Sequence, residues 1–180
     1  MKKGLDFEFR RTVCEADVET VTSIVTSSGF FTEEEIEIAA SLVRERLEFG
    51  PSTGYEFLFA DAGGQTLGYA CYGPTDDDPT LYDLYWIAMQ DRLRGYGVGT
   101  RILLAVEELV RHGGGTVLRI ETSSQPLYTP TRAFYEGHGY TLIDVTEDFY
   151  APGDARCTYT RNVWEPVGGS APSGAEVING

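Results

Sequence analysis

The chain has 180 residues, of which 42% are hydrophobic and 23% are charged, and its formal net charge is −14. This length and composition suit one globular domain with a full hydrophobic core. The acidity argues against nucleic acid as a ligand, because phosphate binding needs a basic surface, and it favours a cationic partner. Acidity also promotes solubility alone, so charge by itself does not choose the substrate.

Neither a membrane segment nor a metal site is expected. No apolar run approaches the ~20 residues of a membrane helix, and no apolar stretch follows Lys2 and Lys3 as in a secretory signal. The three cysteines, Cys14, Cys71 and Cys157, form no Cys-x-x-Cys pair, which is typical of reduced thiols in a cytoplasmic protein. With only two histidines beside them, we predict no metal ligand set.

The first half of the chain is predicted to form two helices between antiparallel strands. Thr32 and Glu35 have the spacing of a capping box and open the second helix. A Gly-rich turn at 61–64 is typical of a β-hairpin. The elements expected from periodicity are a strand over 7–13, helices over 15–27 and 32–50, and strands over 55–60 and 66–72.

The second half alternates strands and helices. The elements expected are a strand over 81–89, a helix over 97–112, a strand over 116–122, a helix over 131–136, and strands over 140–145 and 158–164. Strand–helix–strand steps join parallel strands, whereas consecutive strands form hairpins. We therefore predict an α/β (α+β) fold with a mixed, mostly antiparallel sheet of six to seven strands flanked by about four helices. Residues 1–165 form one domain, and the Gly-, Ser- and Pro-rich residues 166–180 form a flexible tail.

The strongest chemical signal lies where the apolar strand ending near residue 89 runs into a glycine-rich turn and a long amphipathic helix. The turn and the helix start comprise Arg94, Gly95, Tyr96, Gly97, Val98, Gly99 and Thr100. The first N–H groups of a helix lack partners within it, and the helix dipole adds about half a positive charge, so such a turn favours phosphate binding. The alternative is a structural turn whose glycines allow close packing. The Gly-x-x-x-x-Gly-Lys-Ser/Thr pattern of nucleotide loops is absent.

The spacing of Arg94, Gly97 and Gly99 resembles the coenzyme A loop of the GNAT acetyltransferase superfamily, Gln/Arg-x-x-Gly-x-Gly/Ala. A second block at 131–140 resembles that family's Tyr-Glu-x-x-Gly-Phe/Tyr helix and strand. The resemblance covers roughly residues 7–164. It implies a GNAT fold and an N-acetyltransferase that moves acetyl from acetyl-coenzyme A to a primary amine by direct attack in a ternary complex.

The resemblance also implies roles for single residues. Tyr135 would lie near the coenzyme A sulfur as the general acid. Judged by reference pKa values of ~10 for a phenol and ~8.5 for a thiol, proton transfer from the phenol to the thiolate is mildly unfavourable, so the site must tune it. Many members carry Asn seven residues earlier, where this chain has Tyr128, so the contact with the cofactor arm is altered. The further cofactor contacts implied are the turn residues 94–100, the main chain at Ile87, Ala88 and Met89, and the side chains of Tyr128, Phe134 and Tyr135.

For the base we predict Asp83, because some family members carry a carboxylate at this strand position. It lies six residues before Met89, and strand alternation would place both on one face. Asp83 could instead hold a cationic amine or end a hairpin, and Glu121 is the alternative base. We further interpret 148–154 as a loop between the last two strands. In this loop Asp148, Phe149 and Tyr150 could close over a substrate.

Several readings of the activity stay open. One is a coenzyme A-binding regulatory module with little turnover, and another is transfer from a different acyl-coenzyme A. The acceptor could be a small polyamine-like metabolite, an amino acid or antibiotic amine, or a protein amine. The negative net charge favours a small cationic amine. Family members often dimerise, so a homodimer is one expectation.

Overall fold

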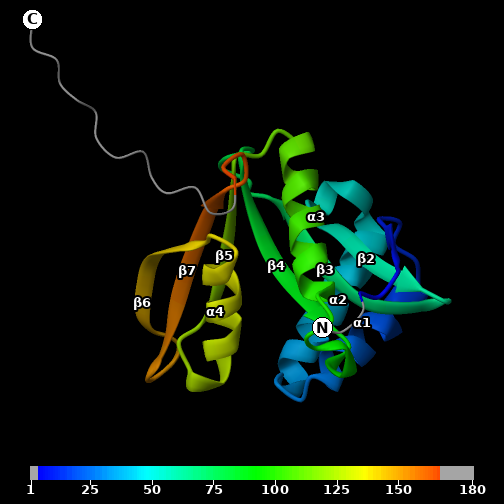
Figure 1. The fold of residues 1–180 in the computed structure, drawn as a ribbon, viewed down its shortest axis with the longest axis horizontal. Coiled ribbons are helices and arrows are strands. Elements are labelled where there is room, and N and C mark those ends of the chain that lie inside the picture. The colour runs from blue at the N-terminus through cyan, green and yellow to red at the C-terminus, as the bar shows by residue number, and fades with distance from the viewer. Residues whose placement is uncertain (1–3, 167–180) are drawn as a thin grey trace, which may run out of the picture.

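The protein's structure, a computed structural model, describes residues 4–166, whose strands form one seven-stranded sheet (Figure 1). The sheet has the order β1-β2-β3-β4-β5-β7-β6. Its strands are β1 (Glu8–Arg10), β2 (Glu56–Ala62), β3 (Gln65–Pro74), β4 (Leu81–Met89), β5 (Val117–Ser123), β6 (Thr141–Ala151) and β7 (Asp154–Asn162). Neighbours are antiparallel except β4 and β5, which are parallel. The predicted mixed sheet is confirmed.

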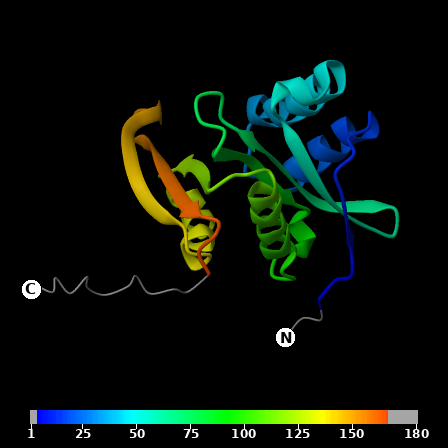
Figure 2. The same cartoon turned by 90° about the horizontal axis from the view of Figure 1, so that it is seen from above.

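Four α-helices flank the sheet in the described part of the chain. They are α1 (Ala16–Ser27), α2 (Glu33–Phe49), α3 (Val98–His112) and α4 (Thr129–Gly137). Figure 2 shows α1 and α2 on one side of the sheet and α3 and α4 on the other. Two apolar cores result: one lies between the sheet and α3 and includes Ile102 and Val106, and the other lies beneath α1 and α2 and includes Val21 and Val43.

Most predicted boundaries agree with the structure, but β1 is much shorter than the predicted 7–13. The strand ends at Arg10, whose guanidinium turns toward α1 and binds both carboxylate oxygens of Asp17 at 2.9 Å. The same guanidinium donates to the Thr12 carbonyl at 2.5 Å, which bends the chain out of the sheet. The tail predicted at 166–180 lies outside the described residues except for its first residue.

A β-bulge in β4 changes which residues face each core. Cys71 pairs with Trp86 and Tyr72 with Leu84, so Tyr85 between them has no partner in the ladder. Before the bulge, Leu84 faces the core beneath α3, and after it Met89 does so. Asp83 therefore points to the α1/α2 face and Met89 to the α3 face. The prediction that they share a face is wrong, because one extra residue reverses the alternation.

The sheet splits between its two parallel strands. β4 and β5 pair only from Leu81–Asp83 to Val117–Arg119. Beyond these residues β4 stays with β3 while β5 stays with β7, and the two strands diverge toward the bottom of Figure 1. We call the paired end near Leu81 the closed end and the end near Met89 and Ser123 the open end. Backbone groups of β4 beyond Asp83 that face β5 have no partner strand there.

Candidate active site

The glycine-rich turn lies at the open end, at the start of α3. Gly95 has φ 80° and Gly97, the N-cap of α3, has φ 78°. Residues with a Cβ adopt such angles only at a cost, so glycine is required for the chain to reverse here. Buried Leu93 and Val98 anchor the turn to the core beneath α3. The first N–H groups of α3 have no acceptor within the helix and are available to an anion.

Gly99 brings the turn into contact with the end of β4. A Cβ at this glycine would lie 2.4 Å from the Met89 Cε and 3.9 Å from the Phe134 Cζ. The first turn of α3, the last residue of β4 and helix α4 thus meet at one point. At Gly99 the lack of a Cβ allows close packing against Met89, as the structural alternative expects, whereas a Cβ at Gly95 or Gly97 would meet nothing within 4 Å.

Arginines give the turn a positive charge within an acidic protein. Arg94 forms an ion pair with Asp91 at 2.6 Å, and its guanidinium lies 4.9 Å from the ring centroid of Phe30. Arg92 and Arg101 lie on either side, and the first turn of α3 contains no acidic residue. Guanidinium groups suit phosphate oxygens, so this end of α3 could hold a pyrophosphate.

Tyr135 lies buried on α4 with 4% of its surface exposed. Its ring packs edge-on against Phe134 at 5.4 Å and Tyr140 at 5.7 Å between centroids. Burial raises the pKa of the phenol well above its usual value, so it stays protonated at neutral pH. Within residues 4–166 no group hydrogen-bonds its hydroxyl, which leaves the proton available for donation.

His138 fixes α4 against the start of α3. Its Nδ1 lies 2.6 Å from the Phe134 carbonyl oxygen, and its Nε2 lies 3.2 Å from the Thr100 hydroxyl. The structure thus brings Thr100, Phe134 and Tyr135, predicted from separate motifs, to one place. Ile87 and Met89 lie on the same side beneath α3, whereas Ala88 faces the other core.

The two candidate bases differ in how they are held. Both oxygens of Asp83 accept hydrogen bonds from Arg119, at 2.6 and 2.8 Å, at the last paired position of the closed end. Glu121 lies two residues beyond Arg119, in the part of β5 that no longer pairs with β4. Its single ion pair, to Arg156, is 3.5 Å long, and 38% of its side chain is exposed. Glu121 is therefore the freer proton acceptor.

The prediction of a loop at 148–154 is only partly correct. β6 continues to Ala151, and only a tight turn separates it from β7. Asp148 has φ 52°, and its carboxylate accepts a hydrogen bond from the Gly153 N–H at 2.6 Å, so it closes this hairpin. Phe149 lies 4.2 Å beneath the Arg156 guanidinium. A bulge between Thr146 and Ala151 sets the intervening residues outside the regular ladder.

Tyr128 faces the connection between α1 and α2, which the sequence analysis did not assign to the site. Its ring centroid lies 6.2 Å from that of Phe30, and Phe31 lies 5.1 Å from Trp86. The signal that could have identified them is a pair of adjacent aromatic residues following Gly29, in a short connection where apolar side chains are otherwise costly.

The comparisons with known proteins agree with this geometry. The model of the acetyltransferase (GNAT) family matches residues 21–140. The chain belongs to the GNAT family. A GNAT-family protein from Desulfovibrio desulfuricans is 42% identical and superposes with a TM-score of 0.86, covering 88% of this chain and 99% of that one. No curated relative matches the sequence.

More distant solved structures share the GNAT fold. An aminoglycoside 6'-N-acetyltransferase in complex with coenzyme A is 14% identical with a TM-score of 0.70, over 88% of this chain and 98% of that one. The ribosomal-protein-S18-alanine N-acetyltransferase of Escherichia coli is 14% identical with a TM-score of 0.69, over 94% of this chain and 99% of that one. These two show that small-molecule and protein acetyltransferases are built on the same fold.

Among residues 4–166 no cluster of three or more His, Cys, Asp and Glu side chains could hold a metal ion. None of the helices in that range is long and apolar enough to span a membrane. Two open hollows of about 500 and 580 Å³ lie beside Arg11 and beside Phe7, and neither is lined by a residue of the candidate active site.

Proposed function

We propose that this GNAT protein transfers acetyl from acetyl-coenzyme A to a primary amine, by direct attack within a ternary complex. The observation that carries the proposal is the convergence of three features at the open end: the glycine turn, the unpaired end of β4, and Tyr135. The coenzyme A complex of a structurally similar aminoglycoside acetyltransferase supports this donor.

Residues of the open end fit the donor. The N–H groups from Gly97 to Thr100, with Arg94 beside them, would hold the pyrophosphate. The backbone from Ile87 to Met89, which β5 has left, would hydrogen-bond the pantetheine arm as a strand would. Acetyl-coenzyme A supplies an acetyl group already activated as a thioester.

The side chains supply acid and base. Tyr135 donates its proton to the departing sulfur, and because burial raises its pKa, the phenol is protonated whenever the reaction runs near neutrality. Backbone N–H groups at the end of β4 stabilise the negative charge that develops on the carbonyl oxygen. The amine must lose a proton to attack, and we assign its removal to Glu121, with Asp83 as the alternative.

Direct attack is favoured because no cysteine is suited to carry the acetyl group. Cys71 and Cys157 are buried, and burial raises the pKa of Cys71 far above that of a free thiol. Cys14 is exposed but precedes α1, at the opposite end of that helix from Phe30. Radiolabelled acetyl trapped on the protein would contradict direct attack.

The test is release of free coenzyme A from acetyl-coenzyme A over a panel of amines, with Tyr135→Phe in parallel. We expect the variant to lose roughly 10²-fold in kcat while its affinity for acetyl-coenzyme A is kept, because only proton donation is removed. Tyr159→Phe is the matched control, since this tyrosine donates to Glu136 at 2.9 Å and not to the site.

Two results would overturn the proposal. Acetyl-coenzyme A binding by calorimetry, with no turnover of any amine, would indicate a regulatory coenzyme A-binding module. Absence of binding would exclude the donor itself. Replacing acetyl- by succinyl-coenzyme A in the same assay decides the acyl group.

A further inference from the structure

An aromatic pair bridges the open end on the face that α1 and α2 cover. Phe30 belongs to the α1–α2 connection, and Tyr128 belongs to the short 3-10 turn (Pro126–Tyr128) that follows β5. Their rings meet at 6.2 Å and 61°. Because Phe30 is carried by one half of the split sheet and Tyr128 by the other, the pair marks the place where a substrate could reach the split from this face.

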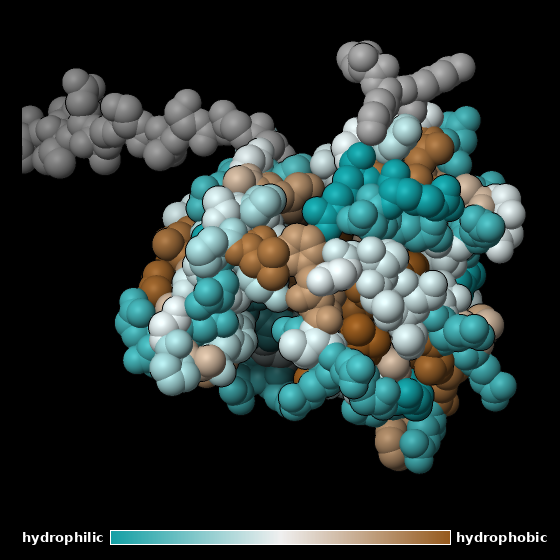
Figure 3. All heavy atoms as spheres, turned by 90° about the horizontal axis from the view of Figure 1, so that it is seen from below, coloured by the Kyte–Doolittle hydropathy of each residue, from teal (hydrophilic) through white to brown (hydrophobic). Residues whose placement is uncertain are grey.

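Two further rings extend this surface toward β4. Phe31 packs on Trp86 at 5.1 Å and 62°, and on Phe30 at 6.5 Å. Trp86 follows the bulge and belongs to the part of β4 that β5 has left. We call Phe30, Phe31, Trp86 and Tyr128 the aromatic site; all four are only partly buried. Figure 3, which views this end of the molecule, shows apolar residues gathered between the two halves.

Carboxylates lie beside the aromatic site. Glu35 lies in the first turn of α2, directly after the connection that carries Phe30 and Phe31. Asp154 is hydrogen-bonded to Ser123, just before the turn that carries Tyr128. Burial raises the pKa of Tyr128, and the negative charges of Glu35 and Asp154 add to the rise. Burial likewise raises the pKa of Tyr150 to about 12, with Glu121 and Asp154 adding to it. Asp154 accepts a hydrogen bond from the Ser123 hydroxyl at 2.5 Å. Neither Glu35 nor Asp154 has an ion-pair partner among residues 4–166.

The cations nearby are held by other groups. Arg156 pairs with Glu121 and covers Phe149, and Arg132 donates to the carbonyls of Ser123 and Gln125. Arg94 lies over Phe30 itself, which shows that this ring face accepts a cation. Glu35 accepts a hydrogen bond from the Thr32 N–H and Asp154 accepts one from Ser123, and neither bond neutralises the carboxylate. A carboxylate on the substrate would be repelled by these two charges, whereas an ammonium group would be attracted.

We infer that the acceptor is a small primary amine on an apolar or aromatic body without a carboxylate, such as an arylalkylamine, bound with its body against the aromatic site and its nitrogen toward Glu121. This assignment rests on the proposed function and names its substrate class. The apolar body removes ring surface from water, and the carboxylates raise the local concentration of the ammonium form. Glu121 then takes one proton from the ammonium group, and the neutral nitrogen attacks the acetyl carbonyl carbon. The carbon–sulfur bond breaks as the departing sulfur takes the proton of Tyr135, and the nitrogen of the new amide releases its second proton to solvent.

The test compares three amines that differ in one feature each. 2-Phenylethylamine has both features, phenylalanine adds a carboxylate, and ethanolamine lacks the apolar body. We expect kcat/KM for 2-phenylethylamine to exceed the other two by about tenfold or more, since ring contact and charge repulsion each contribute. In Asp154→Asn, the ratio of kcat/KM for 2-phenylethylamine to kcat/KM for phenylalanine should fall several-fold.

Phe30→Ala tests the ring directly. We expect it to raise the KM for 2-phenylethylamine about tenfold. Because Arg94 contacts this ring, the KM for acetyl-coenzyme A is measured in the same variant. Phe49→Ala is the matched control, since Phe49 ends α2 and is 59% exposed, away from the aromatic site.

The outcomes separate this inference from the proposed function. Preferred turnover of phenylalanine or ethanolamine would overturn the inference and leave the proposed acetyltransferase activity intact. Acetyl-coenzyme A binding without turnover of any of the three amines would overturn the inference as well. If Phe30→Ala left the KM for 2-phenylethylamine unchanged, the aromatic site would not be the place where the amine binds, and the inference would be wrong. Failure to bind acetyl-coenzyme A would instead overturn the proposed function.

Discussion

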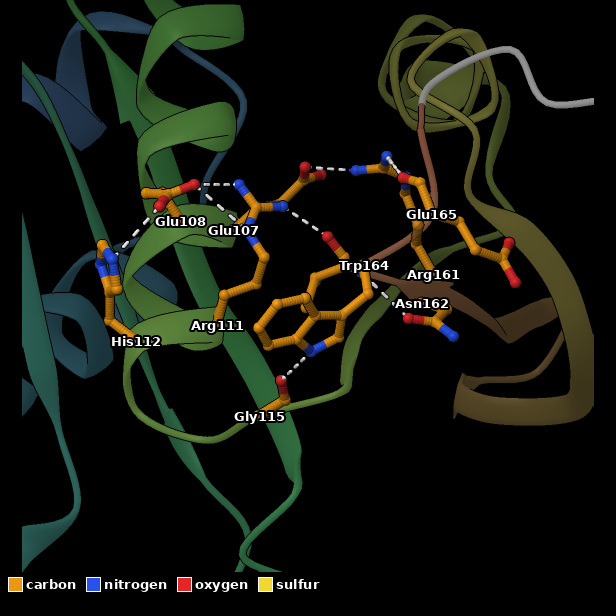
Figure 4. A network of polar contacts seen from close by, with 10 residues as sticks. Glu107, Glu108, Arg111, His112, Gly115, Arg161, Asn162, Trp164 and Glu165 are labelled. Atoms are coloured by element: carbon orange, nitrogen blue, oxygen red, sulfur yellow. Dashed lines mark hydrogen bonds and ion pairs between the residues drawn. The ribbon is translucent and has the colours of Figure 1, made fainter.

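The closed and open ends of the sheet satisfy their polar groups in opposite ways. At the closed end, Glu107 on α3 is 2% exposed, and it accepts a hydrogen bond from the Tyr140 hydroxyl at 2.9 Å. It accepts a second from Arg161 (Figure 4). Arg161 also donates to the Glu165 carbonyl at 2.7 Å. At the open end, the helix N-terminus and the edge of β4 keep backbone groups that nothing in the fold must satisfy.

This difference shows how the fold keeps a split sheet rigid. The chain end beyond β7 is tied to α3 and its following turn by the Arg111 bond to the Val163 carbonyl and by the Trp164 indole N–H, 3.0 Å from the Gly115 carbonyl. Of these contacts, the bonds of Glu107 to Tyr140 and Arg161 are buried, and those of Arg111 and Trp164 are partly buried. Groups that would bind a ligand are therefore held apart without collapsing onto each other.

Breaking the closed end should give the largest effect. Arg161→Met leaves the Glu107 carboxylate buried without its cation, and we expect the free energy of unfolding to fall by about 3–5 kcal/mol. Urea denaturation followed by circular dichroism measures the change. Glu107→Leu combined with Arg161→Met should recover much of the loss, because no charge is then left unpaired. A double variant less stable than the single one would contradict this account.

Glu121 and Asp83 should separate activity from stability. Glu121→Gln removes the proposed base, and we expect kcat/KM to fall roughly tenfold to a hundredfold at neutral pH. Asp83→Asn breaks the pair with Arg119, and we expect it to lower Tm while it changes kcat little. Initial rates and melting curves on both variants make the comparison. A larger rate loss in Asp83→Asn would return the base assignment to Asp83.

Gly97→Ala tests the backbone of the open end. A Cβ at φ 78° costs about 1–2 kcal/mol of backbone strain. If the turn changes its conformation to relieve this strain, its N–H groups move and acetyl-coenzyme A should bind more weakly. Calorimetric titration with acetyl-coenzyme A measures that affinity. Gly137→Ala in α4 is the control, because this glycine is helical and a Cβ there meets nothing within 4 Å. Equal affinities in both variants would mean that the turn does not hold the donor.

The smallest effect is expected at Tyr69, which is buried with its hydroxyl unbonded to any described residue. Burial raises its pKa well above the ordinary value. The unfolded phenol ionises near pH ~10 while the folded one does not, so stability is full below that pH and falls as the pH rises above it. Tyr69→Phe should change the free energy of unfolding little at pH 7. It should also reduce the fall in that free energy between pH 9 and 11, as measured by denaturation. An unchanged alkaline loss would contradict this.

Local signals in the sequence were sufficient for much of the fold. The capping box predicted at Thr32 and Glu35 is present, with reciprocal bonds of 3.2 and 2.8 Å. The glycine-rich turn was predicted from its glycines and the helix that follows, and the structure gives Gly95 and Gly97 φ values near 80°, which favour glycine. Such signals act between residues a few positions apart, and they hold in any packing that keeps the helix or turn.

Long-range pairing decided the rest. Glu107 on α3 is buried, and its burial depends on Tyr140 and Arg161, which lie 33 and 54 positions away along the chain. The sequence by itself determined the order of elements, the phosphate-type turn and the family motifs. Tertiary structure alone decided the bulge at Tyr85, the Asp83–Arg119 pair and the meeting of Phe30 with Tyr128. Each of these depends on which strands and loops become neighbours, and no short stretch of chain encodes that.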